Sequence, residues 1–241
     1  MLHVSPMMDQ LLLDITPPWR PTFDNFVAGR NSELLSALHH ALRGHGTERC
    51  IHIWGIEGSG KSHLLEACAN ARPNAVYAKA QVPESADIVA IDDVDCLDDD
   101  AQVELFNLYN RMREQGGMLL TSSAESPLHL ALRDDLRTRL GWGLVYQVQT
   151  LSDEEKGQAL AQHALNRGFA LAPEISLYLL RHGRRDLPSL LMVLDALDEH
   201  SRRLHRAPSV PLLKEVINNQ LDSRRSLPSS GVVEGGHDEA K

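Results

Sequence analysis

Eight consecutive residues constrain the fold of this chain more than any other part of it. Residues 55–62 read Gly-Ile-Glu-Gly-Ser-Gly-Lys-Ser, between the short apolar run Cys50–Trp54 and a stretch rich in helix formers, 62–69. Buried strand, glycine-rich loop and helix follow one another in the order that lets backbone N–H groups surround a phosphate. The segment therefore predicts a phosphate-binding loop in an α/β domain.

Each residue type in this loop has a role in binding a nucleoside triphosphate. The glycines let the backbone approach the α- and β-phosphates, the Lys61 ammonium reaches the β- and γ-phosphates, and the Ser62 hydroxyl can ligate Mg²⁺. The residue that follows, His63, lies in the same predicted helix. The residues that we expect to contact the nucleotide here are Gly55, Gly58, Ser59, Gly60, Lys61, Ser62 and His63.

Two carboxylates form a second pattern. The apolar stretch 87–93 reads as a strand that ends in Asp92 and Asp93. Magnesium between phosphates needs a nearby carboxylate, and hydrolysis needs another to orient water, so we assign Asp92 to the metal and Asp93 to water. Thr121 or Ser122, at the end of a further strand, would face the γ-phosphate or serve as a simple strand-end cap, and both interpretations stay open.

The order of the predicted elements indicates the fold class. Strands at 50–54, 75–78, 87–93, 118–122 and 144–148 alternate with helical stretches such as 62–69 and 99–115. This alternation predicts an α/β domain with a parallel five-stranded sheet, flanking helices and ligands beyond the carboxyl ends of the strands. From the capping box Ser152–Glu155 onward, amphipathic stretches at 153–168, 173–183, 186–203 and 209–221 predict a small all-helical domain.

We therefore expect four parts. They are an N-terminal peptide and linker (1–21), a nucleotide-binding α/β domain (22–150), a helical domain (151–222) and a polar, glycine-rich tail predicted to be disordered (223–241).

Composition narrows the compartment and the partners. The formal net charge of −9 opposes broad attraction to nucleic acid. Three cysteines without metal-type spacing fit a reducing compartment. The sequence contains neither an export signal nor a run approaching the ~20 apolar residues of a membrane span. We expect a cytoplasmic protein with no membrane partner.

Two arginine-containing segments remain to be interpreted. Charged and apolar residues alternate over 136–140, which contains Arg137 and Arg139, and the pair Arg184-Arg185 precedes a predicted helix. A planar guanidinium suits the charge that develops on a γ-phosphate. Solvation explains a surface arginine equally well, so the residues alone leave both interpretations open.

Several separated segments together resemble the AAA+ ATPase module, and within it the DnaA-related branch that includes the Hda family. They are 22–31, the loop 55–62, 91–93, 136–144 and 151–156, and the resemblance extends over about residues 10 to 221. It implies ATP or ADP with Mg²⁺ as cofactors and identifies the helical domain as the lid. It also implies that Val27, within the segment 26–31, contacts the adenine. Arg139 matches the arginine finger, which acts in trans, and Arg185 matches the sensor 2 arginine of the lid.

The resemblance also implies a function. Hda-family proteins inactivate DnaA, so this chain would be a negative regulator of replication initiation that, with the DNA-loaded β sliding clamp, stimulates hydrolysis of DnaA-bound ATP. Duplex DNA would be contacted only through the clamp, and a homo-oligomer is compatible with a finger in trans. Residues 10–15 resemble the clamp-binding peptide, with Gln10 in a polar pocket and Leu11, Leu13 and Ile15 in an apolar groove. An N-terminal strand or helix pairing onto the domain would look similar.

The chain departs from its relatives in three places. It stops after the lid without the DNA-reading helix-turn-helix module of the initiators, its link 79–85 is short, and 121–127 lacks the usual aspartate-arginine pair. We expect weak turnover by the chain itself. Two alternatives stay open: a self-sufficient AAA+ ATPase that loads or remodels a helicase, and a non-catalytic adaptor that recruits DnaA.

Overall fold

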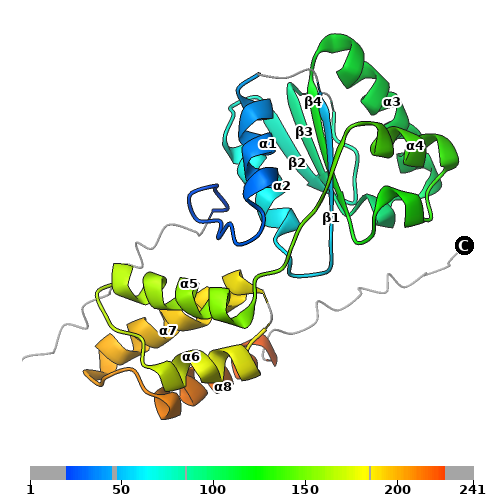
Figure 1. Ribbon diagram of the computed structural model, residues 1–241. Coiled ribbons are helices and arrows are strands. Elements are labelled where there is room, and N and C mark those ends of the chain that lie inside the picture. Colours follow the sequence, from blue (N-terminus) through cyan, green and yellow to red (C-terminus); the bar gives the residue numbers. More distant parts are fainter. Residues whose placement is uncertain (1–19, 45–47, 85, 185, 226–241) are drawn as a thin grey trace, which may run out of the picture. The chain divides into compact units, whose positions relative to one another are not determined.

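The computed structural model describes residues 20–44, 48–84, 86–184 and 186–225 (Figure 1). These residues divide into two compact units. One takes in the chain up to Phe26, Ala37–Trp54 and Lys61–Tyr146; the other takes in Val27–Ser36, Gly55–Gly60 and the chain from Gln147 on. The predicted domain boundaries stay predictions. No helix in the described part combines the length and the apolar character that crossing a bilayer requires.

A five-stranded parallel sheet forms the centre of the first unit, as predicted. Its strands stand in the order β2-β3-β4-β1-β5, with parallel pairing of β2 with β3, β3 with β4 and β4 with β1. Because all of these strands point the same way, their carboxyl ends meet at one edge of the sheet. The strands are β1 (Cys50–Trp54), β2 (Ala75–Lys79), β3 (Ile88–Asp92), β4 (Met118–Ser123) and β5 (Leu144–Gln147).

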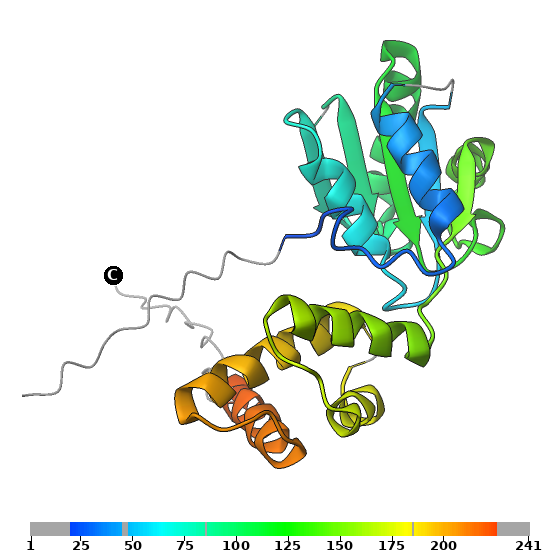
Figure 2. The ribbon, with the colours of Figure 1, turned by 60° about the vertical axis from the view of Figure 1, so that its left-hand side comes forward.

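Helices cover both faces of this sheet. Helices α1 (Ser32–Leu42) and α2 (Lys61–Asn70) lie on one face, and α3 (Asp99–Gln115) and α4 (Asp134–Trp142) lie on the other (Figures 1 and 2). The N-cap of α3 is Asp98, whose side chain accepts a hydrogen bond from the Ala101 amide, and its C-cap is Gly116 in the left-handed region. The core between sheet and helices includes Val89, Ile91, Leu105, Leu108, Met112, Leu119, Leu136 and Leu140.

Helices α1 and α4 were not predicted from the sequence. The alternating pattern over 136–140 is more typical of a strand than of a helix. The two buried residues of α4, Leu136 and Leu140, nevertheless lie one helical turn apart and therefore on the same face of the helix. Two short 3₁₀ helices, Val94–Cys96 and Pro127–His129, follow β3 and β4.

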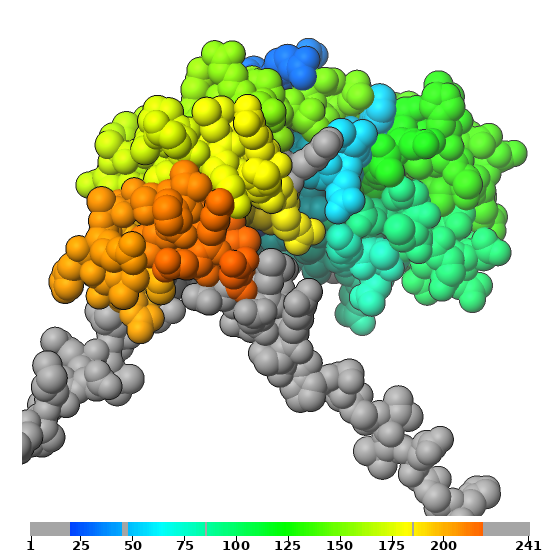
Figure 3. Space-filling model, turned by 90° about the horizontal axis from the view of Figure 1, so that it is seen from below, coloured from blue at the N-terminus to red at the C-terminus, as the bar shows by residue number. Residues whose placement is uncertain are grey.

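The second unit contains the predicted helices, α5 (Asp153–Asn166), α6 (Pro173–His182), α7 (Leu187–Leu204) and α8 (Val210–Arg225). The capping box at the start of α5 is present, since Ser152 Oγ accepts from the Glu155 amide at 3.1 Å and Glu155 Oε2 accepts from the Ser152 amide at 2.7 Å. Figure 3 shows the surfaces of these helices, yellow-green to orange, closely packed against one another. Their core is rich in leucine. Its buried members are Leu160, Ala164, Ile175, Leu179, Leu190, Leu194, Leu197, Leu212 and Leu213.

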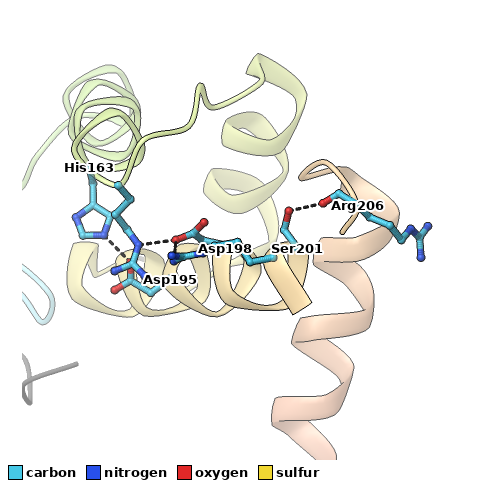
Figure 4. A network of polar contacts seen from close by, with 7 residues as sticks. His163, Asp195, Asp198, Ser201 and Arg206 are labelled. Atoms are coloured by element: carbon cyan, nitrogen blue, oxygen red, sulfur yellow. Dashed lines mark hydrogen bonds and ion pairs between the residues drawn. The ribbon is translucent and has the colours of Figure 1, made fainter. Parts of the chain in front are cut away.

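A polar network joins α5 to α7 (Figure 4). Asp198 is almost completely buried and accepts hydrogen bonds from Arg167, at 2.8 Å, and from Arg202. Asp195, one turn earlier, accepts from His163 Nε2 at 2.6 Å and pairs with Arg167 at 3.3 Å. The two carboxylates therefore fasten the end of α5 to the middle of α7.

Candidate functional site

The predicted phosphate-binding loop joins β1 to α2. Gly58 and Gly60 have φ values of 76° and 103°, which side-chain-bearing residues rarely adopt. The Ser59 amide donates to the Ile56 carbonyl at 3.2 Å, so the loop folds back on itself. Ser59 Oγ is the one buried side-chain polar atom in the described part of the chain without a hydrogen-bond partner. A buried hydroxyl in this state fits a ligand that carries an acceptor, such as a phosphate oxygen.

The start of α7 lies against this loop within the second unit. A Cβ added at Gly58 would lie 3.6 Å from the Cβ of Asp186. Asp186 caps α7 by accepting from the Ser189 amide at 2.9 Å, and its carboxylate lies 3.7 Å from Arg184 Nε. Arg185, the predicted sensor 2 arginine, lies outside the described residues.

The predicted adenine-contacting segment belongs to the same unit. The Asn31 side chain donates to the Gln149 carbonyl at 2.8 Å and accepts from the Gln149 amide at 2.7 Å, so it replaces a backbone pairing. Val27 is half-buried in this segment. A Cβ at Gly55 would lie only 2.8 Å from the Val148 carbonyl oxygen, so the loop also touches the chain that leads into α5. The second unit thus gathers segments 27–31, 55–60 and 148–151 with the start of α7.

His63 fastens the segment 20–26 to α2. Its Nε2 lies 2.8 Å from the Thr22 carbonyl oxygen, and the Phe26 ring meets its ring edge-on with centroids 5.2 Å apart. Burial lowers the pKa of His63, and the hydrogen bond to Thr22 opposes that shift. The side chain therefore has a structural role here, and its predicted contact with nucleotide stays a prediction.

Lys61 and the acidic end of β3 both lie at the carboxyl edge of the sheet. Lys61 is the first residue of α2 and is buried, and Ser62 is half-buried. Asp92 is fully buried, and both its oxygens are engaged: Oδ1 accepts from the Ser122 hydroxyl and Oδ2 accepts from the Tyr77 hydroxyl at 2.9 Å. Burial and the Asp92 charge raise the pKa of Tyr77, so the phenol stays a donor.

Asp93 is held differently from Asp92. Its backbone is left-handed, with φ 53° and ψ 53°, and its amide donates to Ser122 Oγ at 3.1 Å. Its carboxylate lies 3.0 Å from Lys79 Nζ, and the hydrogen bond to Asp93 raises the pKa of Lys79. The carboxylate that we assigned to water thus already has a cationic partner, and the assignment stays a prediction.

The two hydroxyls at the end of β4 point to opposite faces of the sheet. The register sets Thr121 opposite Ile91, which brings Ser122 level with Asp92. Thr121 Oγ1 instead lies 2.8 Å from Nδ1 of His52, whose Nε2 lies 2.8 Å from Ser123 Oγ. Burial lowers the pKa of His52 to about 4, so this imidazole is neutral near pH 7. Of the two candidates, Ser122 shares the face of Asp92; a role for Thr121 stays a prediction.

Arg139 lies at the other edge of the sheet. It occupies the last turn of α4, and a Cβ at the following Gly143 would lie 2.1 Å from the carbonyl oxygen of Cys50, the first residue of β1. Lys61 follows the opposite end of the same strand. The five residues of β1 span about 13 Å at ~3.3 Å per residue, so the Arg139 end of α4 is remote from Lys61 of its own chain.

Five residues of this unit were missed by the sequence analysis. Tyr77 and Lys79 share one face of β2, but only knowledge that β2 pairs with β3 connects them with Asp92 and Asp93. Phe106, Tyr109 and Trp142 surround the Arg139 guanidinium. The spacing of Phe106 and Tyr109 on one helix was the available signal for the last group.

Two family models match the chain. One describes the ATPase domain of bacterial DnaA and matches residues 73–147, and the other describes the lid domain of Hda and matches residues 153–217. The first match covers β2 to β5, and the second covers α5 to the first half of α8.

Solved structures agree on the fold. Domain III of the Thermotoga maritima replication initiation protein DnaA superposes with a TM-score of 0.69 at 21% identity, covering 84% of this chain and 98% of that chain. AMPPCP-bound DnaA from Aquifex aeolicus gives 0.66 at 20% identity, covering 88% and 71%. The Thermotoga maritima RuvB Holliday junction branch migration motor gives 0.62 at 15%, covering 83% and 72%. At these identities the likeness establishes the architecture.

Proposed function

The chain belongs to the DnaA-related AAA+ ATPases, and from this premise we propose that it is a negative regulator of replication initiation. In this proposal it binds ATP or ADP with Mg²⁺, docks on the DNA-loaded β sliding clamp and presents Arg139 to ATP held by DnaA. Hydrolysis of that ATP switches the initiator off. Contact with duplex DNA is only through the clamp.

The position of Arg139 carries the proposal. Its guanidinium belongs to the edge of the sheet opposite Lys61, so a contact with phosphate requires a second molecule. Within the described residues Arg139 makes no ion pair, whereas its neighbours on α4 do: Arg133 pairs with Asp135 at 3.0 Å and Arg137 with Asp134 at 2.7 Å. A cation without a carboxylate partner is available to neutralise charge in another protein's triphosphate.

The residues of the loop fit a nucleotide. The unpartnered Ser59 hydroxyl and the left-handed backbone at Gly58 and Gly60 form a cradle of the kind that phosphate oxygens occupy. Lys61 would hold the β- and γ-phosphates, and Ser62 with Asp92 would hold Mg²⁺. A bound nucleotide would hold the protein in an arrangement in which Arg139 can reach the ATP held by DnaA.

Slow turnover by the chain itself is part of the proposal. The Lys79–Asp93 ion pair engages the carboxylate that hydrolysis in cis would need to orient water. A finger-donating partner has no requirement for its own hydrolysis. The same observation weighs against a self-sufficient helicase loader, which would show steady turnover stimulated by single-stranded DNA.

A reconstitution tests the proposal. DnaA-ATP, sliding clamp, duplex DNA and this protein are combined, and phosphate release is followed with each component left out in turn. Arg139→Ala is expected to lower DnaA-dependent release on the order of 10³-fold while leaving nucleotide and clamp binding intact. Arg137→Ala, two residues away on the same helix, is the matched control and retains the stimulation. Unchanged hydrolysis with Arg139→Ala would refute the finger.

The clamp is tested in the same assay. Gln10 and Leu11 lie outside the described residues, and their replacement by alanine is expected to remove the clamp dependence because the peptide loses its polar and apolar anchors. Leu12→Ala is the control, since Leu12 alternates with the groove-filling Leu11 and Leu13. Clamp binding that survives the double replacement would assign the contact elsewhere.

A further variant separates regulation from recruitment. Lys61→Ala removes the cation that holds the β- and γ-phosphates, so nucleotide binding and the stimulation of DnaA are expected to fall together. Full stimulation by Lys61→Ala would show that nucleotide binding by this chain is dispensable. A chain that binds DnaA but does not stimulate hydrolysis would instead be an adaptor that performs no chemistry.

A further inference from the structure

Three aromatic rings surround the Arg139 guanidinium. Its central carbon lies 4.2 Å from the centroid of the Trp142 ring, 5.7 Å from that of Phe106 and 5.9 Å from that of Tyr109. Each distance is within the range of a cation–π interaction, and the contact with Trp142 is the shortest. The guanidinium is thus held by rings from two helices of one unit.

The rings differ in how firmly they are fixed. The side chain of Tyr109 is buried, and Phe106 packs against the core beneath α3. Trp142 instead is 58% exposed, although its backbone ends α4. Tyr109 and Phe106 are therefore fixed by the core, whereas Trp142 contacts the guanidinium from the solvent side and can be replaced with little effect on the core.

Stacking on a ring and binding a phosphate use different parts of a guanidinium. The π face of the cation meets the ring, whereas the five N–H donors lie in its plane and point outward. Among the described residues no carboxylate takes those donors. A stacked Arg139 is therefore both restrained and able to donate to an anion.

We propose that Trp142 is a positioning residue, which holds the Arg139 guanidinium flat so that its N–H edge is presented to the triphosphate of the partner. A long arginine side chain on a helix surface samples many rotamers, and the ring limits that freedom before the partner arrives. Because transition-state stabilisation depends on placement within about 1 Å, loss of the ring lowers the maximal rate of hydrolysis and not the affinity for the partner. This inference rests on the finger role of Arg139.

The test measures DnaA-ATP hydrolysis in the reconstituted system as a function of the concentration of this protein. Trp142→Ala is expected to lower the maximal rate about tenfold with an unchanged half-saturating concentration. Trp142→Phe keeps a flat ring and is expected to restore the rate to within about twofold to threefold. Leu128→Ala removes another exposed apolar side chain, 83% exposed, from the same unit and should change nothing.

Three outcomes would overturn the inference. An unchanged or increased rate with Trp142→Ala would show that the ring is dispensable or keeps the arginine in an unproductive position. A shift in the half-saturating concentration at constant maximal rate would make Trp142 a contact with DnaA instead. Failure of Trp142→Phe to restore the rate would exclude stacking. Arg139→Ala is measured in parallel. If Arg139→Ala retains full stimulation, the finger role of Arg139 is wrong, and that result is distinguishable from the three outcomes for Trp142.

Discussion

In the proposed function, the ion pair between Lys79 and Asp93 limits the chain's own ATP hydrolysis. Lys79 closes β2, and its ammonium lies 3.0 Å from a carboxylate that is 30% exposed. A pair of this kind contributes only ~0–1 kcal/mol, since water screens it. That energy corresponds to a bias of about onefold to fivefold toward the paired state of the Asp93 carboxylate.

Lys79→Met is expected to raise the chain's own ATP hydrolysis about twofold to fivefold, because Asp93 becomes free to orient water. Methionine keeps most of the aliphatic stem, so the end of β2 stays covered. Steady-state phosphate release without DnaA is the measurement, and the double variant with Asp93→Asn should lose the gain. A rate at or below that of the unchanged protein would mean that Asp93 does not act on water.

Single residues were predictable from sequence where the chemistry is local. Lys61 and Asp92 were singled out by patterns a few residues long, and in the structure Lys61 begins α2 and Asp92 ends β3. Their roles stay predictions. Tyr77 was not predictable as a partner of Asp92, because their contact depends on which strand neighbours β3 and in which register. A spacing of 15 residues carries no signal of that pairing.

The helical elements of the second unit depend on one buried carboxylate. Asp198 lies in the middle of α7 with its side chain 7% exposed, and two arginines from α5 and α7 donate to it. Removing an acceptor from buried donors costs more than the hydrogen bonds themselves contribute, because the donors are left without partners.

Asp198→Ala is expected to destabilise the second unit by about 1–3 kcal/mol. The loss is expected near the lower end of this range, because the Arg202 side chain is exposed and its donors can bind water instead. Urea unfolding followed by circular dichroism measures the loss. Glu199→Ala, an exposed acid next along α7, is the matched control and should remain within about 0.5 kcal/mol. Equal stability of the two variants would show that the network contributes nothing net.

Elements were predictable where the apolar period was clear. The helices of the second unit and the five strands follow from their patterns and caps, including the capping box at Ser152. Helix α4 was not predictable, because its nine residues fit neither the helical nor the strand period of apolar residues. Its conformation depends on the packing of Leu136 and Leu140 on the sheet.

For the molecule as a whole, the buried imidazole of His52 makes stability depend on pH. Its pKa falls from 6.5 to about 4 on folding, because burial disfavours the charged form. Above pH 6.5 neither state binds the proton, and the contribution to stability is fully present. As the pH falls from 6.5 towards 4, His52 becomes protonated in the unfolded chain but stays neutral in the folded chain. The free energy of unfolding therefore decreases progressively.

The loss from this one group amounts to about 3 kcal/mol once the pH has fallen to about 4. The free energy of unfolding, measured in urea at half-unit steps between pH 7 and pH 4.5, is expected to fall accordingly. His52→Gln keeps hydrogen-bonding groups opposite Thr121 and Ser123 but cannot titrate there, so its stability should fall less steeply. Parallel pH profiles for the two proteins would exclude His52 as the cause.

The architecture was predictable from the alternation of strands and helices, whereas the strand order was not. Parallel strands separated by helices imply a covered sheet, and Figure 1 shows α1 and α2 on one face with α3 and α4 on the other. The position of β4 between β3 and β1 brings Ser122 beside Asp92. The strand order depends on packing between segments far apart in the sequence, so local patterns do not predict it.

The distance between the two ends of β1 gives the molecule a direction. In the proposed function the nucleotide site lies at one edge of the sheet and the arginine that acts on a partner lies at the other, so two copies related by a two-fold axis through either edge would bring like edges together. Only head-to-tail contact joins unlike edges, and such contacts propagate until a subunit lacking one of them ends the row. Arg139 and Lys61, near opposite ends of β1, therefore define a polarity along the first unit.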